Sequence, residues 1–78
     1  MPKNGGDILS FSKNLIKLQE ENHETNYRLA KEIGVHQTTV QNWRDGKKPI
    51  LEHLAKVAAH YGCTVDDLLR QDNGEKSV

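Results

Sequence analysis

The chain has 78 residues, of which 35% are hydrophobic and 28% charged, and its eleven basic and eleven acidic side chains give a formal net charge of zero. This length suffices for one small domain and leaves little room for an elaborate catalytic architecture. Neutrality excludes a simple polycation, and the single cysteine, Cys63, excludes an internal disulfide. We expect a small globular domain that rests on its apolar core in the reducing cytoplasm.

The two ends of the chain lack the apolar periodicity of its middle. Residues 1–7 and 71–78 are polar and rich in Gly, Asn, Lys and Ser, which predicts flexible tails around a domain at residues 8–70. The first ten residues carry no apolar stretch of the kind that a signal peptide needs, and no apolar run is long enough to cross a membrane. We therefore expect no association with a membrane.

The first predicted helix covers about residues 8–21. Its apolar residues recur at helical spacing, and the pattern dissolves in the polar segment that follows Glu21. Ser10 or Ser12 is available as its N-cap. The inward positions of this helix are Ile8, Phe11, Leu15 and Leu18.

Two shorter helices follow, separated by a glycine. Thr25 can cap the first of them, whose inward residues include Leu29, Ala30 and Ile33, and Gly34 ends it because glycine accepts a positive φ. The next helix runs from about residue 36 to residue 44. It places Val40 and Trp43 on one face, and its other face is polar throughout.

The C-terminal part of the domain predicts two further helices. Pro49 suits the first turn of the fourth helix, which Gly62 ends, and Thr64 with Asp67 resembles a capping box that opens a short fifth helix. No segment alternates apolar and polar residues over the length of a strand, so the predicted fold is all-α, with five short helices around one core. The inward positions of the last two helices are Leu51, Leu54, Val57, Ala58, Tyr61, Val65, Leu68 and Leu69.

Residues 26–45 have the spacing of two helices that cross steeply over a tight turn. Such a crossing needs a small residue, here Ala30, a φ-permissive residue in the turn, here Gly34, and apolar residues that lock the second helix. The pattern resembles the helix-turn-helix of the Cro and lambda-repressor (XRE) type, and the likeness covers about residues 15–69. It rests on Gly34-Val35, Val40, Gly46-Lys47, Leu54, Ala58, Gly62 and Asp67-Leu68-Leu69.

This resemblance implies a compact lambda-repressor-like domain whose third helix enters the major groove of DNA while its second helix crosses the phosphates. Gln37 and Asn42 suit adenine, because an amide presents a donor and an acceptor together. Asn26 is expected both to hold a phosphate and to brace Gln37. The implied base-reading residues are His36, Gln37, Thr38, Gln41 and Asn42, and the implied phosphate contacts are Asn26, Thr39, Lys47 and Lys48. The alternative for these residues is an ordinary solvated helix face.

The distribution of charge agrees with this interpretation. Residues 26–48 carry two acidic side chains, Glu32 and Asp45, and five basic ones, so the neutral total conceals a basic excess on the helix-turn-helix and the loop after it. The basic residues are Arg28, Lys31, Arg44, Lys47 and Lys48.

The sequence departs from the family pattern at three places. Glu24 stands before the second helix where an apolar residue is usual, and His36 stands where a Ser or Thr cap is usual. Gln19 and Arg44 replace a frequent Arg and Glu pair between the first and third helices, so Arg44 either bonds Gln19 or reaches a phosphate. Trp43 and Cys63 are expected in the core, and the role of Tyr27 is left open.

The resulting hypothesis is a transcriptional regulator that binds double-stranded DNA in a sequence-specific manner, of the phage or mobile-element repressor type. We expect a homodimer on a palindromic operator, joined through the fifth helix and the end of the fourth. The alternative is a protein-interaction module on the same fold, antitoxin-like or regulator-binding, and a protein partner is compatible with either. We expect no enzyme, cofactor or metal site, because His53 and His60 lie about 10 Å apart along one helix.

Overall fold

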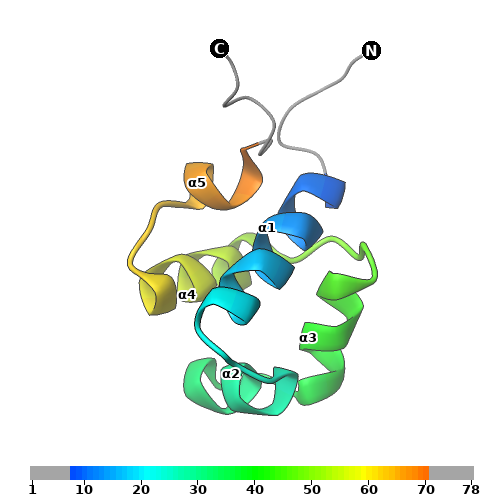
Figure 1. Ribbon diagram of the computed structural model, residues 1–78. Coiled ribbons are helices and arrows are strands. Elements are labelled where there is room, and N and C mark those ends of the chain that lie inside the picture. Colours follow the sequence, from blue (N-terminus) through cyan, green and yellow to red (C-terminus); the bar gives the residue numbers. More distant parts are fainter. Residues whose placement is uncertain (1–7, 71–78) are drawn as a thin grey trace.

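Five helices follow one another in the computed structural model, which describes residues 8–70 (Figure 1). No strand occurs in this part of the chain. The all-α prediction is therefore confirmed, whereas the predicted tails, residues 1–7 and 71–78, lie outside the described residues. The helices are α1 (Ile8–Glu21), α2 (Asn26–Ile33), α3 (Gln37–Arg44), α4 (Leu51–Tyr61) and α5 (Val65–Leu69).

Local capping residues set most of the helix ends. The Thr25 hydroxyl accepts a hydrogen bond from the Arg28 backbone N–H at the start of α2, and Thr64 and Asp67 form the complete capping box of α5. Helices α2 and α4 end at Gly34 and Gly62, whose φ angles are 80° and 70°. Side chains other than glycine rarely adopt this left-handed conformation, which is why the sequence located both ends correctly.

Two roles predicted for residues at helix starts were wrong. Ser10 and Ser12 lie inside α1 and are buried, and the Ser12 hydroxyl donates to the Trp43 backbone carbonyl on α3. The Ser12 side chain therefore joins α1 to α3, and neither serine lies at the N-cap of α1. Pro49 lies just before the N-cap of α4, which is Ile50, so it precedes the first turn instead of occupying it.

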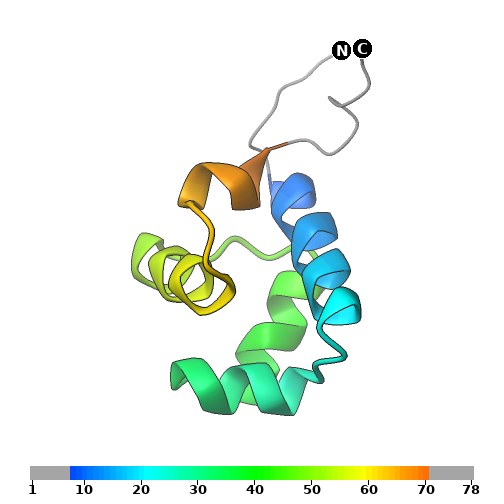
Figure 2. The ribbon, with the colours of Figure 1, turned by 60° about the vertical axis from the view of Figure 1, so that its left-hand side comes forward.

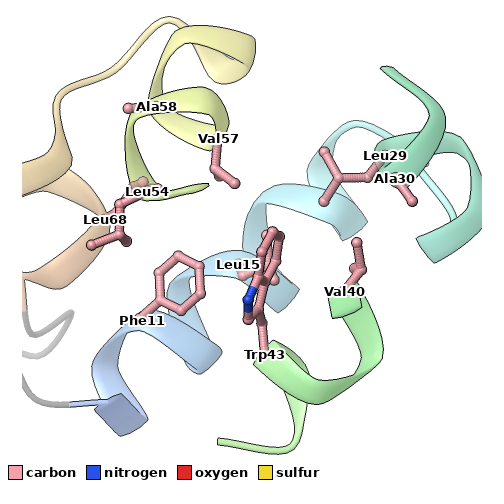
Figure 3. Close-up of a cluster of buried hydrophobic side chains, with 10 residues drawn as sticks. All are labelled: Phe11, Leu15, Leu29, Ala30, Val40, Trp43, Leu54, Val57, Ala58 and Leu68. Carbon is pink, nitrogen blue, oxygen red and sulfur yellow. The ribbon is translucent and has the colours of Figure 1, made fainter. Parts of the chain in front are cut away.

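One apolar core takes side chains from all five helices (Figure 3). Trp43 is 2% exposed and meets the Phe11 ring edge to face, with 6.0 Å between centroids. The expectation that Trp43 packs in the core is confirmed. The buried residues of this cluster are Phe11, Leu15, Leu29, Ala30, Val40, Trp43, Leu54, Val57, Ala58 and Leu68.

The remaining predicted core positions have mixed outcomes. Leu18, Ile33, Cys63 and other half-buried residues pack against the cluster, whereas the side chain of Ile8 lies outside those described. The prediction for Leu51 was wrong, because its side chain is 71% exposed. Leu51 is the first residue of α4, where the helical stripe has not yet reached the core. Tyr61, Val65 and Leu69 are also half-buried against the cluster.

The packing of the helices leaves the outer side of α3 uncovered. Helix α2 packs against α3 and α4, while α1 packs against α3 and α5. Figure 2 shows α2 and α3 meeting at the end of the domain away from α5. Helix α1 thus packs against α3, and α4 packs against α2, on the side of the α2–α3 pair that faces the core.

Candidate nucleic-acid interface

The turn between α2 and α3 is three residues long, from Gly34 to His36. The backbone N–H groups of Gly34 and Val35 both donate to the Ala30 carbonyl, at 2.8 and 2.9 Å. Val35 is half-buried and packs against the core, which holds the turn to the body of the domain. This geometry is the helix-turn-helix that the spacing of Ala30 and Gly34 predicted.

The outer face of α3 is a row of polar side chains. His36, Gln37, Thr38 and Gln41 are exposed, while Thr39 and Asn42 are half-buried between this face and the core side. Amide and hydroxyl groups of this kind can present paired donors and acceptors to base edges. The exposed positions on α3 are thus available for the base-reading role predicted for them.

His36 occupies the N-cap of α3 in extended backbone conformation, and its side chain makes no capping hydrogen bond. A Ser, Thr, Asp or Asn at this position would satisfy a backbone N–H of the first turn. The exposed imidazole is therefore placed at the tip of α3 without a capping role in the free protein.

Asn26 forms a hydrogen bond with a different residue of α3 than the one predicted. Its Nδ2 donates to Gln41 Oε1 at 2.9 Å, and Gln41 Nε2 donates to Asp45 Oδ1 at 3.1 Å. The expected brace between Asn26 and Gln37 is wrong, because Gln41, one turn further along α3, lies within reach of the first residue of α2.

Arg44 contacts the first helix. Its Nη1 donates to Gln19 Oε1 at 2.6 Å, and Gln19 Nε2 donates to Asn26 Oδ1 at 3.0 Å. Of the two roles left open for Arg44, the bond to Gln19 is therefore present in the structure. Gln19, four residues after Leu15, falls on the buried side of α1 and is 2% exposed, and this spacing was the signal that could have marked it as part of the site.

Glu24 is stabilised by two residues from the end of α4. Its carboxylate accepts from the Tyr61 hydroxyl at 2.5 Å and lies 2.8 Å from His60 Nε2. Burial, followed by the hydrogen bond to Glu24, raises the pKa of Tyr61 well above its ordinary value. The departure from an apolar residue at position 24 is thereby explained, and the segment before α2 is tied to α4.

The basic residues are not equivalent. Arg28 forms an ion pair with Glu32 one turn away at 3.3 Å, whereas Lys47 and Lys48 are exposed in the loop after α3. Exposed lysines suit contact with phosphates, since they contribute charge without reading bases. Among the basic residues, Lys47 and Lys48 are therefore the candidates for that role.

An open hollow of about 570 Å³ lies where the end of α1, the start of α2 and α3 meet. Polar groups line it, among them His23, Thr25, Asn26, Gln41 and Arg44. Within residues 8–70 no three His, Cys, Asp or Glu side chains gather into a metal-binding group. Across the same residues, no helix is both long enough and apolar enough to span a membrane.

The steep α2–α3 pair, its glycine turn and the polar outer face of α3 define a helix-turn-helix domain. The sequence matches the model of one family of such domains over residues 14–72. The chain belongs to the Cro/C1-type HTH DNA-binding domain family. This membership confirms the resemblance to Cro and lambda repressor.

Solved structures share the fold. A transcriptional regulator from Listeria innocua is 30% identical, with a TM-score of 0.71, over 76% of this chain and 56% of the listerial one. Apo-HppE is 23% identical, with a TM-score of 0.73, over 87% of this chain and 38% of its own. FeII HppE in complex with substrate is 20% identical, with a TM-score of 0.74, over 92% and 40% of the two chains.

These likenesses differ in what they support. The chain spans little more than half of the listerial regulator, and the two HppE structures show the fold alone. Comparison with the curated proteins gave no match. The family establishes a DNA-binding domain, and the neighbour from Listeria is itself a transcriptional regulator.

Proposed function

We propose that this protein is a sequence-specific transcriptional regulator of the phage or mobile-element repressor type, which occupies an operator through α3 in the major groove. The observation that carries the proposal is the exposed polar face of α3, whose opposite side packs against α2 and the core. Nothing in this role calls for catalysis or a cofactor. It would place the protein with the DNA, in the cytoplasm expected from the sequence.

Two groups of residues would contact the DNA duplex, one at the bases and one at the phosphates. His36, Gln37, Thr38, Gln41 and Asn42 would face base edges, whereas phosphates would be held by other side chains. Arg44 donates to Gln19 in the structure, and we do not count it among the proposed phosphate contacts. Those contacts are Asn26, Thr39, Lys47 and Lys48.

We also propose that two copies bind one palindromic operator, since α3 has eight residues and covers only a few base pairs. Helix α5 and the end of α4 would form the contact between the copies. Val65 and Leu69, which are half-buried, supply its apolar surface. Half-sites would then lie about 34 Å apart.

The test is a titration of the DNA upstream of the protein's own coding region, followed by fluorescence anisotropy at several salt concentrations. We expect nanomolar, salt-dependent binding to one palindromic site, with two chains per site. Saturation at one chain per site would contradict the dimer. Binding that does not depend on salt, or no binding to any duplex, would favour a protein-interaction module, for which the exposed Ile50 is the relevant observation.

A further inference from the structure

Four side-chain hydrogen bonds join into one continuous chain at the corner between α1, α2 and α3. They link Arg44 to Gln19, Gln19 to Asn26, Asn26 to Gln41, and Gln41 to Asp45, with donor–acceptor distances of 2.6, 3.0, 2.9 and 3.1 Å. We call these five residues the amide relay. Three of them are amides, and the two ends carry opposite charges.

The chemistry of the two ends fixes the direction of the relay. A guanidinium group only donates hydrogen bonds and a carboxylate only accepts them. With Arg44 donating at one end and Asp45 accepting at the other, each amide between them has one orientation that satisfies both neighbours. The Glu24 backbone carbonyl, 3.4 Å from Gln19 Nε2, favours the same orientation at the buried end.

The relay connects the interior of the domain to the outer face of α3. Gln19 is 2% exposed, whereas Gln41 is exposed and belongs to the residues proposed to read bases. Rotation of the Gln41 amide would exchange its donor and its acceptor, and these two arrangements suit different base edges. The orientation of Gln41 is therefore a determinant of which base pair it favours.

We propose that Gln19 and Asp45 are positioning residues that set the orientation of the Gln41 amide, and through it the base preference at the position Gln41 faces. The relay is a property of the free protein. Its consequence for base preference rests on the proposed function.

Reversing the relay from its buried end tests this proposal. In Q19E the new carboxylate still accepts from Arg44 but cannot donate to Asn26. The Asn26 amide must then rotate to donate to position 19, and Gln41 must rotate to donate to Asn26. That rotation turns Gln41 Oε1 toward the Asp45 carboxylate, where two acceptors face each other.

A second substitution removes the conflict at the far end. In Q19E/D45N the amide at position 45 can donate to the rotated Gln41, so the three bonds between positions 19 and 45 run in the opposite direction while Arg44 still donates to position 19. Residues 19 and 45 share no hydrogen bond, and the coupling between them passes through Asn26 and Gln41. The single variant D45N completes the double-mutant cycle.

The first measurement is NMR of the free protein. We expect Q19E to shift the side-chain NH2 resonances of Asn26 and Gln41 and to lower the thermal midpoint, and we expect Q19E/D45N to recover much of that midpoint. K13Q is the control, because it lowers the net charge by one from an exposed position on α1 and should leave these resonances in place.

The second measurement is a binding titration over duplexes that vary one base pair at a time. We expect Q19E to reduce discrimination at one position about threefold to tenfold, the range of one neutral hydrogen bond. We expect the double variant to favour a different base there, although its stability recovers. A purely structural role would restore the wild-type preference together with the stability.

The outcomes separate the two proposals. Wild-type protein that binds no duplex would overturn the proposed function and leave the NMR test of the relay intact. Wild-type binding combined with an unchanged Gln41 resonance and unchanged base preference in Q19E would overturn the relay. If Q19E does not fold, N26D breaks the same chain nearer the surface, because an aspartate cannot donate to Gln41. An unchanged Gln41 resonance in N26D would likewise overturn it.

Discussion

The carboxylate of Glu24 is largely buried and therefore needs hydrogen-bond partners, of which it has two. Its side chain is 10% exposed, and His60 and Tyr61 both bond to it across 36 and 37 residues of sequence. A buried acidic group without such partners would cost far more than an apolar one. Glu24 therefore fits a position that usually holds an apolar residue because α4 supplies polar groups opposite it.

This contact predicts a loss of stability in alkali. The folded state raises the pKa of Tyr61 above its ordinary value of 10.0, chiefly through burial and then through Glu24. Above pH 10 the unfolded chain ionises this tyrosine while the folded chain keeps it protonated, so the free energy of unfolding falls as pH rises. Thermal melts from pH 8 to 11 should show this fall, and Tyr61→Phe should reduce it. An identical alkaline profile in Tyr61→Phe would contradict the assignment.

Single apolar side chains matter most where they are closed off from water. Trp43→Ala should destabilise the domain by about 3–5 kcal/mol, because it removes a 2% exposed ring that meets Phe11 and leaves a cavity. Tyr27→Ala is the control, since Tyr27 is 60% exposed and its loss should stay within about 0.5 kcal/mol. Urea unfolding of both variants checks this, and equal effects would refute the difference in packing.

At the scale of helices, the sequence predicted those helix ends that depend on residues close together along the chain. Thr25, Gly34 and Gly62 mark helix ends through local chemistry, and those ends were correct. The predicted cap of α1 was not, because Ser10 and Ser12 lie inside the helix and the Ser12 hydroxyl donates to a residue 31 positions away. Tertiary contact determined that role.

The same division holds for the candidate site. The exposed face of α3 followed from its polar pattern and the family resemblance. The partner of Asn26 did not, because Gln37 and Gln41 lie on the same helix face and only the packing of α2 on α3 decides between them. The bonds of Glu24 to His60 and Tyr61 had no signal in the spacing of residues at all.

Helices α3 and α4 both begin without a side-chain capping hydrogen bond, so a substitution at His36 has a matched control at Ile50. Neither His36 of α3 nor Ile50 of α4 makes a side-chain capping bond. Replacing either with serine should stabilise the protein by about 0.5–2 kcal/mol. We expect His36→Ser also to weaken operator discrimination, whereas Ile50→Ser should leave it unchanged, as measured by thermal melts and duplex titrations. Equal discrimination in both variants would remove His36 from the base-reading residues.

For the whole molecule, net charge is a poor guide to partners. The chain is neutral, yet Lys47 and Lys48 lie exposed beside the polar face of α3. Because phosphate contacts act locally, the salt dependence of DNA binding should follow these residues and not the total charge. The reading of bases and the contact with phosphates can then be distinguished by two substitutions.

Gln37 begins α3 and Lys47 lies beyond its end. Substitutions at these two positions should therefore affect DNA binding in different ways. Gln37→Ala should cost about 1–3 kcal/mol on the operator and little on random duplex, because an amide contributes where the correct base is present. Lys47→Ala should weaken both duplexes alike and lower the slope of log K against log salt by about one, because it removes one released counterion. Titrations of both variants on both duplexes at several salt concentrations measure each effect. If Gln37→Ala weakened both duplexes equally, or Lys47→Ala left the slope unchanged, α3 would not lie in the groove as proposed.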